Sequence, residues 1–372
     1  MATTHVLFSL LLMLCSIFLL PAWYAHPLQS CNLDQIYQLG DSISDTGNLI
    51  RESTFGAASP FARLPYGETF FKTATGRCSN GLLMIDYLAM AAGLPLLNPF
   101  KNTDAIFRHG ANFAVAGSTA LPTEILAVKN ISSPVTGSSL SVQLDWMFTH
   151  FNSICYDERD CVEKLKNSLF FVGEIGGNDY KYALFQGKSM EEVKSMVPEI
   201  VEAIMDAVRR VIQYGAVRVV VPGNFPIGCF PIYLTGFKTN DLSAYDENHC
   251  LKALNSFSMY HNDCLQKAIE GLKQEYPNAI IVYGDHYNAF QWLLHEASNQ
   301  GFDATSLQKA CCGIGGDNNF SLARMCGAPE VPVCGEPNRL ISWDGVQLTQ
   351  EAYKVMAGKL IDDTLPQLQC MA

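Results

Sequence analysis

One serine follows a glycine turn at the end of a short apolar run, a position that suits nucleophilic chemistry. The turn reads Gly40-Asp41-Ser42, and residues Gln35 to Leu39 before it have the character of a buried strand. Such a turn presents the serine hydroxyl to a cleft, and its free backbone N–H groups can bind the oxyanion formed when an ester is attacked. Alone, the same tripeptide also fits a helix N-cap or an Asx-type turn. Ser42 is therefore a candidate nucleophile that needs partners from elsewhere in the chain.

Short runs of β-branched and aromatic residues indicate the sheet that must position this serine. Each run is almost continuously apolar, as in strands buried on both faces of a parallel sheet. The runs are Gln35 to Leu39, Ala111 to Ala116, Leu169 to Val172, Val217 to Val221 and Ala279 to Tyr283. Stretches of helical periodicity alternate with them, at 81–92, 142–151, 190–214, 251–276 and 350–361. This alternation predicts a doubly wound, three-layer α/β/α fold of flavodoxin-like type, with a mainly five-stranded parallel sheet.

The predicted strands end in glycine and small polar residues. Besides the Ser42 turn, these ends are Gly117-Ser118, 176–179, Gly223-Asn224 and Gly284-Asp285. Ligands bind at the carboxyl edge of open parallel sheets, so these distant segments are expected to build one site. No linker, low-complexity tract or internal repeat interrupts the chain, which predicts a single domain at 31–370.

Three sequence blocks occur in the order 40–48 (with Gly40-Asp41-Ser42), 112–118 (Asn-Phe-Ala-Val-Ala-Gly-Ser) and 176–179 (Gly-Gly-Asn-Asp). In this combination the chain resembles the plant GDSL esterase/lipase family, a branch of the SGNH hydrolases, over essentially its whole mature length. The resemblance implies a carboxylic ester hydrolase that works through an acyl-serine intermediate, without a metal or a cofactor.

The resemblance also implies roles for single residues. Ser42 matches the nucleophile, while its own N–H, the N–H of Gly117 and the side-chain amide of Asn178 match the oxyanion hole. The chemistry agrees, because a tetrahedral oxyanion needs converging neutral donors and a glycine permits close approach of the backbone. Without the resemblance, Gly117 reads as a tight turn and Asn178 as a capping side chain.

The last block departs from the family at its catalytic base. Relatives carry Asp-x-x-His before the final helix, whereas this chain reads Asp344-Gly345-Val346-Gln347. Asp344 matches the orienting aspartate, and Gln347 takes the place of the histidine. A carboxamide can hydrogen-bond to Ser42 but cannot accept its proton near neutral pH. Loss of the base from a serine triad costs on the order of 10⁶-fold in turnover and leaves roughly 10³ to 10⁴-fold over water.

Another histidine would have to replace the missing base, and no histidine follows His295. His286 is the best candidate, because it follows the fifth predicted strand at the edge where the site is expected. The alternative for His286, a packed or solvated loop histidine, is the more common situation. His249 and His261 lie in or near a predicted helix and are expected to be structural or solvated.

The segments 37–42, 222–229 and 311–313 resemble a branch of the family that deacetylates a plant indole alkaloid. This implies a small acetyl ester of a specialised metabolite as the substrate. Three functions remain open: an esterase impaired by Gln347, a catalytically silenced relative that binds an ester-like ligand, and an acyltransferase that passes the acyl group from Ser42 to an alcohol.

The N-terminal sequence and the net charge of the chain indicate its compartment and limit its partners. An uncharged apolar run at 6–20, with small residues Ala22 and Ala25 after it, predicts a signal peptide at 1–25; a retained anchor is the alternative. Secretion would lead to the extracellular space (apoplast) or the vacuole, without stable membrane insertion once the signal is removed. A net charge of −11 argues against nucleic acid as a partner.

Cysteines and sequons agree with the secretory route. Twelve of the 13 cysteines lie beyond the signal, which suits an oxidising compartment. Cys155 and Cys161 bracket a short turn and are candidates to pair, and the cysteines at 311, 312, 326 and 334 suggest a crosslinked loop. A zinc site is disfavoured, because there is no Cys-x-x-Cys unit and no histidine near this cluster. Asn130 and Asn319 are the predicted glycosylation sites.

Overall fold

The computed structural model describes residues 27–370 and contains a five-stranded sheet in which every pair of neighbours is parallel. The predicted signal peptide lies outside the described residues. The strand order is β2-β1-β3-β4-β5. Their bounds are β1 Gln35–Leu39, β2 Gly110–Asn112, β3 Ser168–Val172, β4 Arg218–Pro222 and β5 Ile280–Gly284.

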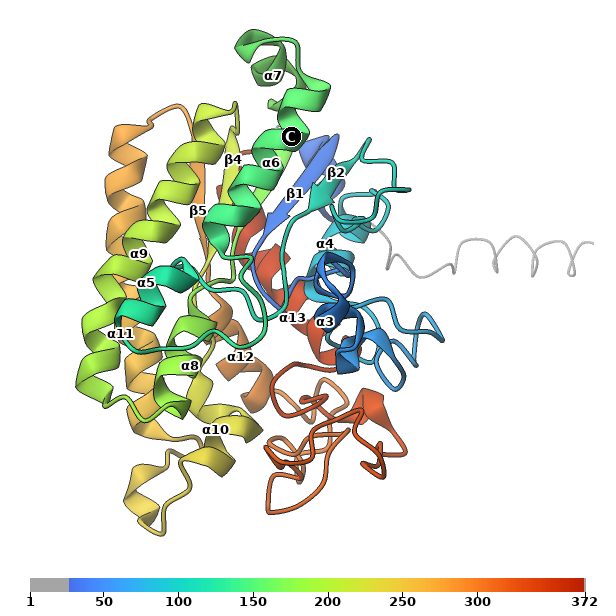
Figure 1. The fold of residues 1–372 in the computed structure, drawn as a ribbon, viewed down its shortest axis with the longest axis vertical. Coiled ribbons are helices and arrows are strands. Elements are labelled where there is room, and N and C mark those ends of the chain that lie inside the picture. Colours follow the sequence, from blue (N-terminus) through green and yellow to red (C-terminus); the bar gives the residue numbers. More distant parts are fainter. Residues whose placement is uncertain (1–26, 371–372) are drawn as a thin grey trace, which may run out of the picture.

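Helices cover both faces of this sheet (Figure 1). One face carries α6 (Leu140–Ile154), α9 (Met190–Gln213) and α11 (Lys252–Glu275), and the other carries α4 (Met84–Ala91), α12 (His286–His295) and α13 (Gln350–Thr364). The remaining α-helices are α2 (Leu49–Glu52), α3 (Thr54–Ala57), α5 (Thr123–Val128), α7 (Glu158–Leu165), α8 (Gly177–Phe185) and α10 (Pro231–Gly236). The predicted doubly wound α/β/α fold is therefore confirmed.

The sequence placed most of these elements correctly but missed two features near the site. The second strand stops at Asn112 rather than Ala116, because the Asn112 side chain accepts from the Ala114 N–H and donates to the Ser44 carbonyl, which turns the chain. Helix α8 begins at Gly177, directly after Gly176 at φ +99°, within a segment expected only to end a strand. Both differences bring polar groups toward the end of β1.

Disulfides tie down the segments that lack regular structure. Within residues 27–370 the pairs are Cys31–Cys370, Cys155–Cys161, Cys229–Cys250, Cys311–Cys334 and Cys312–Cys326. The pairing of Cys155 with Cys161 and the crosslinked late loop were both predicted. That loop, 296–349, lies below the sheet in Figure 1 and carries Asp344 and Gln347. None of the described helices has the length and apolarity needed to span a bilayer.

Candidate active site

The turn after β1 is shaped by Asp41 and contains Ser42, the candidate nucleophile. The Asp41 Oδ1 atom accepts the Ile43 N–H at 3.0 Å, so the aspartate itself forms the Asx turn that was the alternative interpretation of this segment. Gly40 precedes it at φ +156°, where a Cβ atom would lie 3.0 Å from the Glu174 carbonyl oxygen. Ser42 is 7% exposed and lines a cavity at the carboxyl edge of the sheet.

Two backbone N–H groups near this serine are free to bind an oxyanion. Among the hydrogen bonds of residues 27–370, neither the N–H of Ser42 nor that of Gly117 has a partner. Gly117 has φ +85°, and a Cβ atom there would lie 2.5 Å from Val135. The Tyr182 hydroxyl donates to the Gly117 carbonyl at 2.8 Å and holds the peptide from its other side. Only glycine fits this position.

The Asn178 amide is held between the Ser42 turn and the segment that contains Gly117. Its Nδ2 donates to Asp41 Oδ2 at 3.0 Å and to the Ser118 carbonyl at 2.8 Å. Both of its N–H bonds are thus engaged in the free protein, so binding an oxyanion requires one of them to exchange its acceptor. Asn178 occupies the first turn of α8, where the partial positive charge of the helix end also favours a developing negative charge.

Buried carboxylates and amides fasten the Ser42 segment to the Gly117 segment. The Asp45 carboxylate accepts the N–H groups of Gly47, Asn48 and Leu49 in its own segment. It also accepts the N–H group of Ala116, in the Gly117 segment, at 2.8 Å. Asn48 Nδ2 donates to the carbonyls of residues 112 and 114. These residues lie inside the sequence blocks that were recognised, but no role was assigned to them.

Two further positioning residues were missed altogether. Gln143 on α6 accepts the Gly40 N–H at 2.9 Å and donates to the Gly40 carbonyl and to Ser118 Oγ, both at 2.8 Å. Asp179 on α8 accepts the N–H groups of Ala120 and Leu121 at 2.8 and 3.0 Å. Asp179 lies next to Asn178 in a recognised block, whereas nothing in the local sequence distinguishes Gln143 from an ordinary helical glutamine.

The late loop brings Gln347 and Asp344 to Ser42. With the Gln347 carboxamide oxygen accepting from Ser42 Oγ at 3.1 Å, its nitrogen donates to the two Asp344 carboxylate oxygens at 2.6 and 2.8 Å. The opposite amide orientation would turn the oxygen toward the carboxylate, where both atoms are acceptors, and is therefore rejected. Ser42, Gln347 and Asp344 thus form the hydrogen-bonded series of a serine triad, with an amide in the middle.

Asp344 is almost completely buried and fully hydrogen-bonded. Oδ1 accepts the backbone N–H groups of Val346 and Gln347, and Oδ2 accepts the Tyr66 hydroxyl at 2.7 Å. Burial raises the pKa of Asp344, and these donors offset part of that effect. The aspartate therefore orients Gln347 rigidly, as it would orient a histidine.

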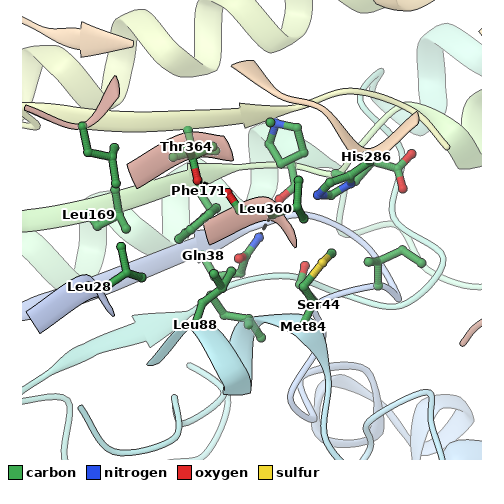
Figure 2. A pocket seen from close by; sticks show the side chains of 18 residues that line it. Leu28, Gln38, Ser44, Met84, Leu88, Leu169, Phe171, His286, Leu360 and Thr364 are labelled. Atoms are coloured by element: carbon green, nitrogen blue, oxygen red, sulfur yellow. Dashed lines mark hydrogen bonds between the residues drawn. The ribbon is translucent and has the colours of Figure 1, made fainter. Parts of the chain in front are cut away.

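His286, the best substitute base by sequence, does not lie at the serine. It is buried, and burial lowers its pKa to about 3, so the ring is neutral. Its ring packs against Phe225, with centroids 4.9 Å apart, and it lines a separate cavity of about 40 Å³ that Ser42 does not line. Figure 2 shows His286 among the residues lining that cavity. His261 is buried with Nδ1 2.7 Å from the Tyr180 hydroxyl, as expected for a structural histidine.

The cavity at Ser42 has a volume of about 60 Å³. By this measure one water molecule needs about 10 to 15 Å³, so the cavity accommodates a group of a few heavy atoms. Its wall is mostly apolar, made by Phe225, Ile227, Phe230, Ile232, Tyr233 and Val346. Its carboxyl and amino side chains are those of Asp41, Glu174 and Lys181. Burial raises the pKa of Asp41 to about 6 and that of Glu174 well above its ordinary value.

A doubly wound sheet, a serine at the end of its first strand and an aspartate in the loop before its last helix define an α/β serine hydrolase. The family model for GDSL-like Lipase/Acylhydrolase matches residues 36–360. Acetylajmalan esterase 1 of Rauvolfia serpentina is 46% identical over 91% of this chain and 89% of its own length. GDSL esterase/lipase At5g03980 of Arabidopsis thaliana is 45% identical over 100% of this chain and 99% of its own length.

The chain therefore belongs to the GDSL esterase/lipase family and is a carboxylic ester hydrolase by class. Among solved structures, the crystal structure of phospholipase A1 from Streptomyces albidoflavus NA297 matches with a TM-score of 0.34 and 14% identity, covering 77% of this chain and 91% of that one. The family assignment depends on the sequence relatives alone.

Proposed function

We propose that this protein hydrolyses a small, acetyl-type ester of a plant specialised metabolite, such as an indole alkaloid, through an acyl-Ser42 intermediate. The observation that carries the proposal is the position of Ser42, with its hydroxyl bonded to Gln347 and its N–H unpaired beside a cavity of about 60 Å³. A cavity of this volume has room for an acetyl group. Relatives named acetylajmalan esterase support the same substrate class.

In this mechanism Ser42 Oγ attacks the ester carbonyl, and the oxyanion is stabilised by the N–H groups of Ser42 and Gly117 and by the Asn178 amide. Asp344 fixes Gln347, whose oxygen orients the serine hydroxyl without taking its proton. The serine proton is passed on to the alcohol oxygen as the bond between that oxygen and the carbonyl carbon breaks. Water then cleaves the acyl-serine and releases the acid. We expect this arrangement to be slower than one with a histidine, but faster than uncatalysed hydrolysis.

The test compares the unmodified chain with Ser42→Ala on a chromogenic acetyl ester and on its hexanoyl and decanoyl analogues. We expect acetyl ester turnover that falls to the uncatalysed rate in Ser42→Ala and that decreases as the acyl chain lengthens. Ser298→Ala, at an exposed serine, is the matched control. Equal rates in the unmodified chain and Ser42→Ala would overturn the proposal.

The bond between Gln347 and Ser42 also favours a second candidate, a silenced relative that binds an ester-like ligand without cleaving it. Saturable binding of the ester by calorimetry, with no product released after prolonged incubation, would support this candidate. An acyltransferase using Ser42 is distinguished by adding an alcohol acceptor and identifying the acylated product.

The disulfides support passage through the secretory route, because such bonds persist in oxidising compartments. The two proposed glycosylation sites differ in their surroundings. Asn130 is exposed, whereas the side-chain nitrogen of Asn319 donates to the Ala310 carbonyl at 2.7 Å. The glycan-bearing nitrogen of Asn319 is thus already used by the fold, and we expect Asn130 to be the better acceptor.

A further inference from the structure

The cavity at Ser42 contains a lysine without an ion pair. Lys181 lies on α8 three residues after Asn178, so both side chains are on the same face of the helix, toward the cavity that both line. Within the described part of the chain the Lys181 ammonium group makes no hydrogen bond or salt bridge. Its Nζ atom lies 5.2 Å from the centroid of the Tyr182 ring. The side chain is half-buried.

The other polar groups around Ser42 are an amide, a carboxylate that already accepts two hydrogen bonds, and groups whose pKa is raised by burial. Gln347 is an amide. The Asp41 oxygens are occupied by the Ile43 N–H and the Asn178 amide. Burial and the nearby Asp41 charge raise the pKa of the Glu174 carboxyl group, which favours its protonated form. Burial also raises the pKa of the Tyr233 phenol, and Lys181 is the one amine among the residues that line the cavity.

We infer that Lys181 is the general base for Ser42 in this chain, in the role that a histidine has in relatives; the inference rests on the proposed esterase function. Serine hydrolases with a Ser-Lys pair show that an amine can perform this step. The reacting form is the neutral amine, which a lysine adopts when water is excluded from around it.

In the acylation step the Nζ lone pair takes the proton of Ser42 Oγ, directly or through one water molecule. At the same time Oγ bonds to the ester carbonyl carbon and the carbonyl π electrons move to oxygen. The oxyanion collapses, the bond to the alcohol oxygen breaks, and that oxygen takes the proton from the ammonium group. A water molecule repeats the sequence on the acyl-serine and releases the acid.

Charge around the lysine sets the pH at which it works. Loss of hydration lowers the pKa of Lys181, and carboxylates and a thiol nearby offset part of this effect. The titratable groups that face it are Asp41, Asp344, Cys78, Glu174, Tyr182 and Tyr233. Turnover therefore rises with pH as the Lys181 ammonium group loses its proton.

The first experiment measures kcat/KM on an acetyl ester against pH for the unmodified chain, Lys181→Met and Lys181→Arg. Methionine keeps the length of the side chain without an amine, and arginine keeps the charge but cannot lose its proton. We expect both variants to lose roughly 100-fold or more and to lose the pH dependence. Lys188→Met, in the loop that follows α8 and paired with Glu192, is the matched control. Full activity in Lys181→Arg would overturn the inference and indicate a purely electrostatic role.

The second experiment restores the amine. Lys181→Cys treated with bromoethylamine carries a thioether analogue of lysine, whose amine has a lower pKa than lysine itself. We expect activity to return with its pH profile shifted to lower pH, whereas identically treated Lys181→Met stays inactive. Failure to recover activity, with an unchanged unfolding midpoint, would count against the lysine as base.

A fluorophosphonate probe separates this inference from the proposed function. Labelling of Ser42, followed by mass spectrometry, requires only an activated serine. No labelling above the Ser42→Ala background would remove the esterase proposal itself. Labelling that is equally fast and equally pH-dependent in Lys181→Met would remove the role of Lys181 alone.

Discussion

The carboxamide oxygen of Gln347 lies 3.1 Å from the hydroxyl oxygen of Ser42. This is the distance at which a base would receive the serine proton, and the backbone around Gln347 is fixed by its own N–H bond to Asp344 at 2.7 Å. The site therefore keeps the geometry of a triad while the central residue lacks the chemistry of a base.

In the Lys181→Met background, Gln347→His is expected to raise kcat on an acetyl ester by roughly 10² to 10⁴-fold, the range typical of a positioned general base. Asp344 is already placed to accept the imidazole N–H. Gln266→His in the same background, which adds a histidine on an exposed face of α11, is the control for an unspecific effect. A rate in Gln347→His no higher than in this control would show that the loop does not hold residue 347 in a catalytic position.

Tyr66→Phe removes the hydroxyl that donates to Asp344 Oδ2 at 2.7 Å. We expect the free energy of unfolding to fall by about 1.5 to 3 kcal/mol, because a buried carboxylate loses a donor. Urea denaturation monitored by circular dichroism measures this change. Tyr156→Phe, at a tyrosine that is 94% exposed, should be neutral. A similar loss in both variants would contradict the interpretation.

Gly117→Ala and Gly358→Ala should have opposite effects. At Gly117 the φ of +85° and the 2.5 Å approach to Val135 predict a loss of roughly 1 to 3 kcal/mol in stability and of about 100-fold in turnover. At Gly358, within α13, a Cβ atom meets nothing within 4 Å, and alanine should add roughly 0.5 to 1 kcal/mol. Thermal unfolding and ester turnover measure both, and a neutral Gly117→Ala would refute the strain argument.

Asp179 should make stability depend on pH. Burial raises its pKa to about 7 from an ordinary 3.8, so the folded state binds this proton more tightly than the unfolded state does. Its contribution is complete below pH 3.8 and is lost as pH rises to about 7. We expect Asp179→Asn to flatten the fall of unfolding free energy across this window, measured by urea denaturation at several pH values. Asp104→Asn, on the exposed surface, should leave the slope unchanged.

The sequence predicted the sheet well because buried parallel strands have a strong local pattern. Residues 35–39 were identified to the residue, since every side chain from Ile36 onward is buried. The same reasoning extended the second strand too far, because the turn at Asn112 depends on the distant Ser44 carbonyl. Lys181 carried no local signal, since its role follows from which cavity α8 faces. The role of Gln143 likewise depends on a contact 103 residues away in sequence.

The bond between Cys31 and Cys370 joins positions 339 residues apart, close to the two limits of the described chain. Almost the entire polypeptide is thereby a covalent ring. A protease that cuts once in a surface loop opens the ring without releasing a fragment, so the halves stay at high effective concentration and the sheet can survive the cut. The protein would then migrate as one species until a reductant is added.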